Sequence, residues 1–387
     1  MDGGKKIFIV TGEHSGDALG GPLMKALKAR LGDKVEFACV GGKYMEEQGA
    51  KSIFPLSDIA VMGPIDIAKN LPRLIRRVYT TVDAIKKFKP DLLVIIDSPE
   101  FSHPIAKRIR KATPDVPIIN YVSPSVWAWR PGRARKMKPY VDHILALLPF
   151  EPDAHKRLGG PDCTYVGHPM IERMEWMRSR DGDGLQRRLG LSGTQPVVVV
   201  LPGSRTNEVK RLMQPFGDTL NIARERFGPF QVIIPAVPSV RPLIEQGLST
   251  WNITPHFVSG DDDKFAAFSL AHAALAASGT VTLEIALSGL PMVVGYKADW
   301  VVASVRKYLI NIHSVVLANL VLGYNAFPEY IQEDCVPEKM SEALVPLLTN
   351  SQERKKQKEA LNEISQKMLL DDREPSDAAA DVVMKYL

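Results

Sequence analysis

The sequence of 387 residues has few cysteines, no long hydrophobic run and no strong excess of one charge. Its three cysteines, Cys39, Cys163 and Cys335, are widely spaced and form no CxxC pair. A disulfide framework or a zinc site is therefore not expected, and a reducing compartment fits. No stretch approaches the roughly 18 uncharged apolar residues that span a bilayer. The first apolar run starts at Ile7 with no cleavage site before it, so we expect no signal peptide.

The overall charge is modest. A net charge of +5, with 24% charged and 45% hydrophobic residues, is ordinary for a soluble globular protein. It suits an anionic substrate or an anionic membrane surface, but it is far from the basic footprint of a nucleic-acid-binding protein, so no nucleic-acid partner is expected. The length exceeds what one hydrophobic core usually supports, which favours two domains.

Short apolar runs alternate with amphipathic segments of helix length. The runs occupy residues 7–10, 92–96, 118–122 and 144–147, and then 197–201, 231–235, 256–258, 273–276 and 292–296. Continuous apolar runs that alternate with helices are typical of buried parallel strands. The sequence therefore predicts an α/β protein with two facing, doubly wound (Rossmann-like) parallel-sheet domains and a cleft between them.

A polar, glycine-rich stretch at residues 178–184 indicates the boundary between the two domains. We expect an N-terminal domain at residues 1–180 and a C-terminal domain at residues 181–350. Residues 351–387 predict charged C-terminal helices that cross back or are exchanged in a dimer, and a solvated face explains most of their charge.

The motif Ser278-Gly279-Thr280-Val281-Thr282-Leu283-Glu284 follows a predicted strand and opens a helix. Hydroxyls of Thr280 and Thr282 at a helix start can bond phosphate oxygens. Glu284, one turn later, can accept the hydroxyls of a ribose, as acidic residues do in dinucleotide folds. The motif predicts a site for the diphosphate and ribose of a sugar nucleotide. The alternative is a capping box in which Glu284 only caps its own helix.

A second phosphate candidate, Gly203-Ser204-Arg205, follows the predicted strand 197–201. The glycine allows a tight turn and close backbone approach, Ser204 offers a hydroxyl and a backbone N–H, and Arg205 offers a fork that suits phosphate. The following helix adds its positive N-terminal end. An ordinary turn with a surface arginine has the same sequence.

Acidic and hydroxyl side chains follow the first two long apolar runs. Glu13, Ser15 and Asp17 come after residues 7–10, and Asp97 and Glu100 come after residues 92–96. Ligands of doubly wound sheets bind at the carboxyl ends of strands, where a carboxylate can act as a general base on a hydroxyl. The alternative for Asp97 is that it caps a helix starting near residues 102–105.

Two further segments have the composition of binding surfaces. Trp127, Trp129 and Arg130 lie in the loop after residues 118–122, which favours a ligand surface, although tryptophans that pack a domain interface are the alternative. The second segment contains the apolar residues Val61, Met62, Ile65, Ile67 and Leu71 beside a cluster of arginines. This composition fits insertion into an anionic membrane interface. The alternative is a helix packed on the core, which has the same spacing of apolar residues.

Taken together, these motifs resemble one family, the bacterial lipid-A-disaccharide synthases. The resemblance extends in order over most of the chain and includes Gly41-Gly42 with Met45, Tyr165-Val166-Gly167-His168-Pro169 and Trp127-Ala128-Trp129. It implies a GT-B fold without metal or other cofactor. It also implies transfer of a diacylglucosaminyl group from UDP-2,3-diacylglucosamine to 2,3-diacylglucosamine 1-phosphate (lipid X). The product is the β(1→6) lipid A disaccharide 1-phosphate, with UDP released and the stereochemistry inverted.

The resemblance also implies residue roles. Asp97 is the base on the acceptor 6-hydroxyl, with Glu13, Ser15, Asp17, Glu100, Trp127 and Arg130 around the acceptor and cleft. Ser204, Arg205, Ser278, Gly279, Thr280, Thr282, Glu284 and Asn319 hold UDP. Asn319 stands where the family usually has Leu-Pro-Asn, and here Ala318 replaces the proline. The family further implies peripheral attachment to the cytoplasmic face of the inner membrane and a homodimer with exchanged C-terminal parts.

Other functions fit parts of the pattern. Asp261-Asp262-Asp263 has the spacing of a metal-dependent transferase, although a loop and a helix cap also explain it. A UDP-N-acetylglucosamine epimerase shares the two α/β domains, and a transferase acting on a peptidoglycan lipid is closer still. A sugar-nucleotide sensor or membrane scaffold would explain the nucleotide loop but not Asp97.

Overall fold

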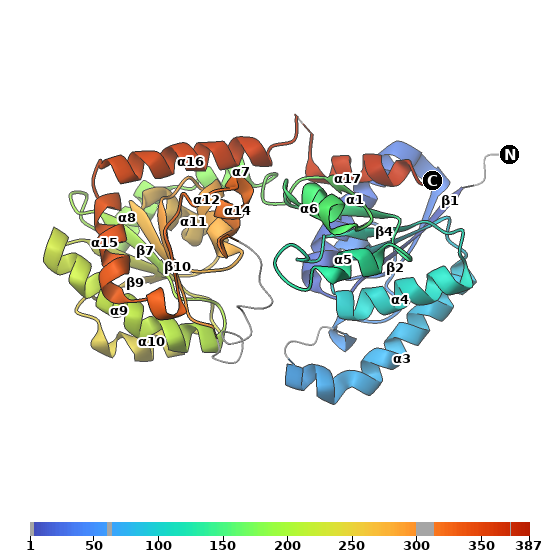
Figure 1. Ribbon diagram of the computed structural model, residues 1–387, viewed down its shortest axis with the longest axis horizontal. Helices are drawn as coiled ribbons and strands as arrows, with labels where there is room; N and C mark the ends of the chain where they lie inside the picture. The colour runs from blue at the N-terminus through green and yellow to red at the C-terminus, as the bar shows by residue number, and fades with distance from the viewer. Residues whose placement is uncertain (1–3, 60–63, 299–312, 372) are drawn as a thin grey trace. The chain divides into compact units, whose positions relative to one another are not determined.

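The computed structural model describes residues 4–59, 64–298, 313–371 and 373–387, and these form two compact units (Figure 1). The first unit comprises Met1–Pro169 and Leu370–Leu387, and the second comprises Met170–Leu369. The break lies before the expected position at residue 180, because α7 (Met174–Arg178) belongs to the second unit. The C-terminal tail is divided between the units.

The first unit is built on six parallel strands in the order β2-β1-β3-β4-β5-β6. Ile9 of β1 lies between Cys39 of β2 and Val94 of β3, so the chain winds outward from β1 in both directions. The switch of direction falls between β1 and β3. The strands are β1 (Lys5–Thr11), β2 (Val35–Val40), β3 (Leu92–Ile96), β4 (Ile118–Tyr121), β5 (His143–Ala146) and β6 (Asp162–Tyr165).

The helices of the first unit include one from the far end of the chain. They are α1 (His14–Leu31), α2 (Lys43–Glu46), α3 (Pro64–Phe88), α4 (Pro99–Ala112), α5 (Gly132–Met137), α6 (Glu151–Leu158) and α17 (Pro375–Met384). The C-terminal helix α17 packs against α1 (Figure 1). Arg30 of α1 reaches Asp377 and Asp381 of α17, each at 2.8 Å, and fastens the returning chain.

The second unit repeats the architecture with the strand order β12-β11-β10-β7-β8-β9, again all parallel. Its switch of direction falls between β7 and β10, whose residues are all buried. The strands are β7 (Val197–Leu201), β8 (Gln231–Pro235), β9 (His256–Val258), β10 (Ala273–Ala277), β11 (Met292–Tyr296) and β12 (Glu329–Ile331).

Helices cover the second sheet and include the long, charged α16 near the C-terminus. Besides α7 they are α8 (Gly182–Leu189), α9 (Thr206–Phe227), α10 (Arg241–Gly247), α11 (Asp261–Leu270), α12 (Val281–Leu287), α14 (Leu317–Leu322), α15 (Pro337–Leu347) and α16 (Gln352–Met368). Short 3-10 turns lie at Gly32–Lys34, Leu56–Asp58, Leu248–Thr250 and Gln332–Asp334. Across the described ranges no helix is both long and apolar enough to cross a bilayer.

The predicted doubly wound α/β architecture, present twice, is confirmed, and every apolar run named from the sequence coincides with a strand. Three strands were not predicted, namely β2, β6 and β12. Each lies at the edge of its sheet and is partly exposed.

One buried polar side chain ties α16 to the second sheet. The Gln357 side chain accepts a hydrogen bond from Met292 N at 2.8 Å and donates one to Met292 O at 3.2 Å, and the residue is only 4% exposed. Met292 begins β11, so this contact satisfies backbone groups at the start of a core strand.

Replacing this glutamine should destabilise the second unit. Gln357→Ala leaves a buried N–H and C=O without partners, which should lower the free energy of unfolding by about 2 kcal/mol. Gln366→Ala, at an exposed position of the same helix, should change it by less than about 0.5 kcal/mol. Urea unfolding followed by circular dichroism measures both, and equal effects would show that the contact does not matter.

Candidate functional site

The first unit has a pocket at its switch point. Its volume is about 480 Å³, and its polar wall comes from the residues that follow β1 and β3, namely Gly12, Glu13, Ser98 and Glu100. The rest of the wall is apolar except for Arg108, and includes Ile59, Leu71, Leu74, Ile75, Val78, Phe101 and Pro104. The pocket therefore joins a polar strand edge to an apolar surface that suits a hydrocarbon chain.

The turn that carries Asp97 has a strained backbone. Asp97 and Ser98 both have positive φ, at 49° and 45°, a region that residues other than glycine rarely adopt and that is concentrated at functional sites. Surrounding bonds hold it: Asp97 N donates to Tyr121 O at 3.0 Å and Ser102 Oγ donates to Asp97 O at 2.6 Å. Gly12 lies so close that a Cβ there would fall 2.5 Å from Ser98 Cβ.

The surroundings of Asp97 favour its protonated form. Burial raises the pKa of Asp97 above its ordinary value, the charge of Glu100 raises it further, and a hydrogen bond from the Ser98 backbone opposes both. A carboxyl with a raised pKa is a better proton acceptor once it is ionised. The capping alternative is wrong, because α4 begins at Pro99 and its N-cap residue is Ser98.

The other acidic and hydroxyl side chains near this pocket differ in accessibility. Glu13 and Ser15 are exposed at the start of α1. Asp17 is 2% exposed, and its carboxylate accepts backbone hydrogen bonds from Gly42, Tyr44 and Met45 at 2.8, 3.0 and 3.2 Å. Asp17 thus fixes the loop after β2 and does not line the pocket.

Glu100 and Arg130 are surface residues. The Glu100 side chain is 69% exposed and lies 3.6 Å from the guanidinium of Arg133. Arg130 has a φ of 53° and stacks on the ring of Trp129 at 5.3 Å. Both keep a charged group exposed, Glu100 at the wall of the pocket and Arg130 on the loop that follows β4.

Trp127 is held by a buried glutamate that the sequence did not single out. Its Nε1 donates to Glu151 Oε1 at 3.1 Å, and its ring meets Phe150 edge-on at 5.1 Å. Glu151 Oε2 accepts the backbone N–H groups of Leu147 and Leu148 at 3.1 and 3.0 Å. Burial raises the pKa of Glu151 to about 7 despite these hydrogen bonds.

The second unit also has a pocket at its switch point, of about 360 Å³. The residues after β7 and β10 form most of it, with contributions from β8 and α11. Its lining residues are Leu201, Gly203, Ser204, Arg205, Glu208, Pro235, Val237, Lys264, Ala277, Ser278, Gly279, Thr280, Val281 and Glu284. The two predicted phosphate-binding segments, around Arg205 and around Thr280, therefore lie in one pocket.

A glutamate occupies the N-terminal end of α9. Glu208 Oε2 accepts the backbone N–H groups of Ser204 and Arg205 at 3.3 and 3.4 Å, and Glu208 Oε1 accepts from Arg205 Nη1 at 2.9 Å. These are the donors expected to meet phosphate. Most of the Arg205 side chain, 81% by accessible area, remains exposed.

The loop after β10 divides its side chains between structure and pocket. Ser278 Oγ donates to Val315 O at 2.9 Å, and the buried Thr282 donates to Gly279 O at 2.8 Å. Thr280 is exposed at the start of α12. Glu284 does not close a capping box; its Oε2 lies 3.1 Å from Lys264 Nζ.

Asn319 is buried and fastens its own segment. Its amide nitrogen donates to Ser314 Oγ at 3.2 Å and to Phe327 O at 3.0 Å, while its oxygen accepts from Ala326 N and Phe327 N, both at 3.0 Å. It does not line the second pocket. Because Val315 accepts a hydrogen bond from Ser278, Asn319 shapes the segment that supports the nucleotide loop.

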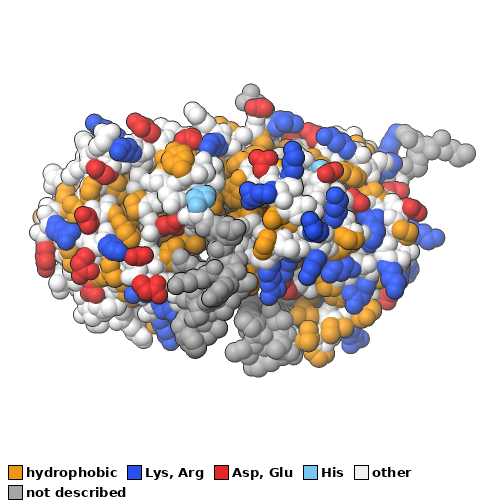
Figure 2. Space-filling view, viewed as in Figure 1, with side chains coloured by type: hydrophobic (Ala, Val, Ile, Leu, Met, Phe, Trp, Pro, Cys, Tyr) orange, Lys and Arg blue, Asp and Glu red, His pale blue; other side chains and the backbone are white. Residues whose placement is uncertain are grey.

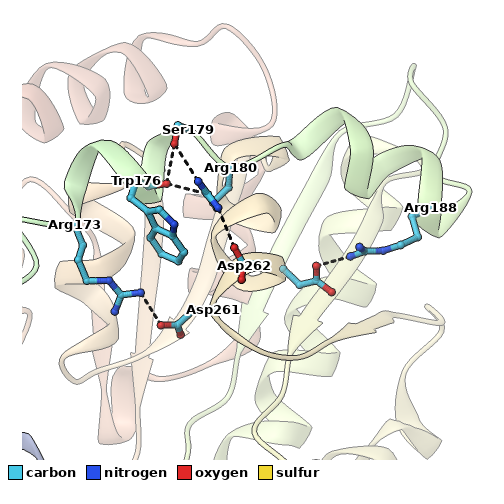
Figure 3. Close-up of polar contacts among 8 residues, drawn as sticks. Arg173, Trp176, Ser179, Arg180, Arg188, Asp261 and Asp262 are labelled. Atoms are coloured by element: carbon cyan, nitrogen blue, oxygen red, sulfur yellow. Dashed lines mark hydrogen bonds and ion pairs between the residues drawn. The ribbon is translucent and has the colours of Figure 1, made fainter. Parts of the chain in front are cut away.

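The three aspartates that open α11 each pair with an arginine. Asp261 lies 2.9 Å from Arg173, Asp262 lies 2.9 Å from Arg180, and Asp263 contacts Arg188 (Figure 3). Their carboxylates are directed to separate partners rather than to a common point. Within the described part of the chain, no three metal-ligating side chains are grouped to hold an ion.

Helix α3 carries part of the predicted membrane patch. Val61 and Met62, and the side chains of Ile65 and Ile67, lie outside the described residues. Leu71, Ile75 and Tyr79 are 49%, 48% and 51% exposed. Figure 2 shows hydrophobic side chains beside Lys and Arg along the lower edge of the first unit, where α3 lies.

The opposite face of α3 packs on the core. Val78, Val82 and Ile85 are buried against the first sheet. The two alternatives drawn from the sequence therefore apply to different faces of one helix: Val78, Val82 and Ile85 belong to the core, whereas Leu71 and Ile75 present apolar side chains outward.

Comparison with known proteins identifies the family. The family model described as lipid-A-disaccharide synthetase matches residues 7–383. A lipid-A-disaccharide synthase of Rhodopseudomonas palustris (strain HaA2) is 48% identical over 383 residues, which are 99% of this chain and 96% of that protein. A synthase of Nitrobacter winogradskyi has the same identity and coverage. The chain belongs to the lipid-A-disaccharide synthase family.

Solved structures of other enzymes share the fold of this synthase-family chain. A UDP-GlcNAc 2-epimerase from Neisseria meningitidis, bound to UDP-GlcNAc, superposes with a TM-score of 0.62 at 12% identity and covers 98% of both chains. MurG from Acinetobacter baumannii has a TM-score of 0.61 at 12% identity, covering 98% of this chain and 99% of its own. At this identity the likeness shows the fold alone, and it confirms the expected GT-B type.

Glu151→Gln should alter how stability depends on pH. Because the pKa of Glu151 is raised from 4.5 to about 7, the folded protein keeps a proton that the unfolded chain loses. The contribution of Glu151 to the free energy of unfolding is therefore full below about pH 4.5 and is lost as the pH rises through about 7. Melting temperatures from pH 5 to 8 should show the wild-type advantage over the variant falling with pH.

Histidines whose pKa is lowered act in the opposite direction and cancel in this comparison. Burial lowers the pKa of His103, His155 and His168 to about 4, so their contribution rises with pH in both proteins. A difference between wild type and variant that stays constant with pH would show that Glu151 titrates normally.

Proposed function

We propose that this protein is a lipid-A-disaccharide synthase that joins two acylated glucosamines. It transfers 2,3-diacylglucosamine from its UDP derivative to 2,3-diacylglucosamine 1-phosphate and releases UDP. The observation that carries the proposal is the family relationship over residues 7–383, together with one pocket at the switch point of each unit. A two-substrate transfer needs two such sites.

The second-unit pocket takes the UDP group. Thr280 and Arg205 line it and supply a hydroxyl and a guanidinium for the diphosphate. Ser204 adds a backbone N–H at the start of α9, where the end of the helix favours an anion. In the absence of nucleotide this N–H donates to Glu208, and the phosphate replaces the Glu208 carboxylate as its acceptor. Glu284 accepts the ribose hydroxyls. Ser278, Thr282 and Asn319 act indirectly, since their hydrogen bonds shape the loop.

The first-unit pocket takes the acceptor, with an acyl chain along its apolar wall. Asp97 removes the proton of the acceptor 6-hydroxyl as that oxygen attacks the anomeric carbon of the donor. The bond from that carbon to the UDP oxygen breaks, and UDP leaves with the electron pair. A single displacement inverts the configuration, and donors in the nucleotide pocket stabilise the charge that develops on UDP.

The exposed face of α3 contacts the membrane surface that holds the acylated substrates. Leu71 and Ile75 line the acceptor pocket and are also exposed, so the pocket opens onto an apolar surface. The exposed Arg73 and Arg76 supply charge that attracts anionic headgroups. This supports peripheral attachment to the cytoplasmic face of the inner membrane. The homodimer with exchanged C-terminal parts stays a prediction.

Asp97→Asn should nearly abolish disaccharide formation. Loss of a general base lowers a rate by about a hundred- to ten-thousand-fold. Binding of UDP should stay within about twofold, because Asp97 lies in the other unit. Mass spectrometry detects the product with both substrates present and with each omitted. Asp115→Asn, an exposed aspartate before β4, is the control. Undiminished turnover in Asp97→Asn would remove this residue as the base.

Leu71→Ser combined with Ile75→Ser should reduce binding to vesicles that contain an anionic phospholipid. Both side chains are about half exposed, so the melting temperature should change little. Sedimentation without sugar substrates should show a several-fold smaller bound fraction. Leu369→Ser, which alters an equally exposed apolar residue on the second unit, should not change it. Unchanged sedimentation of the double variant would contradict membrane docking through α3.

A further inference from the structure

The nucleotide pocket contains a lysine that the proposed reaction leaves without a role. Lys264 of α11 lines the pocket beside Glu284 of α12. Its Nζ lies 3.1 Å from Glu284 Oε2, and the two side chains are only 20% and 21% exposed. A partly buried ion pair inside a binding pocket restrains the side chains that will meet the ligand.

Lys264 is itself held from other directions. Its Nζ lies 3.1 Å from Asp261 Oδ1 and 4.5 Å from the centroid of the Phe265 ring. Burial alone would raise the pKa of Asp261, but Arg173 and Lys264 outweigh it and hold the pKa below its ordinary value. Asp261 therefore stays ionised and keeps its hold on the lysine.

The start of α11 is fastened to the segment that enters the second unit. Arg173 lies 2.9 Å from Asp261, and Arg180 lies 2.9 Å from Asp262. Figure 3 shows both arginines beside Trp176, and their guanidinium groups lie 4.6 and 4.5 Å from its ring. Lys264 thus projects from a helix end that these pairs hold in place.

The hydrogen-bonding capacity of the pair suits a ribose. An ammonium has three N–H donors, and a carboxylate can accept on both oxygens. With Lys264 Nζ bonded to Oε2 of Glu284, Oε1 can accept a hydrogen bond from a ribose hydroxyl. A glutamate without such a partner would lose rotamer freedom on binding, whereas a carboxylate already oriented loses less.

We propose that Lys264 is a positioning residue for nucleotide recognition. Its ammonium holds the Glu284 carboxylate in the orientation that accepts the ribose hydroxyls. This inference rests on the proposed function, since it presupposes a uridine nucleotide in the second-unit pocket. Lys264 acts through Glu284, so its effect depends on the hydroxyls that Glu284 binds.

Calorimetric titration of the full chain with UDP and with 2′,3′-dideoxyuridine diphosphate tests this dependence. Wild type should prefer UDP by about tenfold or more, as expected for hydrogen bonds to a charged group. Lys264→Ala should reduce this preference to about threefold or less, mainly by lowering the affinity for UDP. Lys264→Arg should retain most of the preference. Lys210→Ala, which alters an exposed lysine of α9, should leave both affinities unchanged.

A second pair of variants shows whether the lysine acts through the glutamate. In a Glu284→Gln background, Lys264→Ala should no longer change the preference for UDP. If Lys264→Ala weakens the binding of both nucleotides equally, Lys264 contacts the diphosphate instead. If it leaves both affinities unchanged, the lysine is merely solvated. Either result overturns the inference. A wild type that binds neither nucleotide would instead contradict the proposed nucleotide site.

Discussion

The carboxyl edge between two strands that wind in opposite directions is the constraint on which this protein depends. At β1 and β3 in the first unit, and at β7 and β10 in the second, the connections leave toward opposite sides of the sheet. A crevice is left where the strands end. The strands themselves are buried on both faces, so polar groups can gather only beyond their last residues. Both pockets lie at these two places.

The two pockets treat charge differently. In the second, each cation is paired with a carboxylate, Arg205 with Glu208 and Lys264 with Glu284, so the site stays balanced until a ligand anion arrives. Beside the first, Asp97 lies on a strained turn next to Ser98, which lines the pocket, and burial of Asp97 raises its pKa. One arrangement favours binding of a charged group and the other favours removal of a proton.

Much of this could be predicted from residue patterns, and the failures have physical causes. Central strands such as β3 and β7 are buried on both faces and appear as apolar runs. The edge strands β2, β6 and β12 are partly exposed and mix polar with apolar residues, so no such run marks them. Asp17 and Asn319 resemble ligand-binding residues in sequence. A polar side chain beside a strand end has the same appearance whether it bonds substrate or backbone, and here both bond backbone.

The sequence by itself determined the two doubly wound sheets, the strand ends where chemistry gathers, and the positions of Asp97, Arg205 and Glu284, because hydrophobic periodicity and turn residues act over short distances. Only the tertiary structure decided which polar groups reach a pocket. Glu151 under Trp127 and Lys264 against Glu284 acquire their roles from contacts between residues far apart in the sequence. The last of these joins residues on different helices, and no local pattern encodes it, since burial and pairing depend on how distant segments pack together.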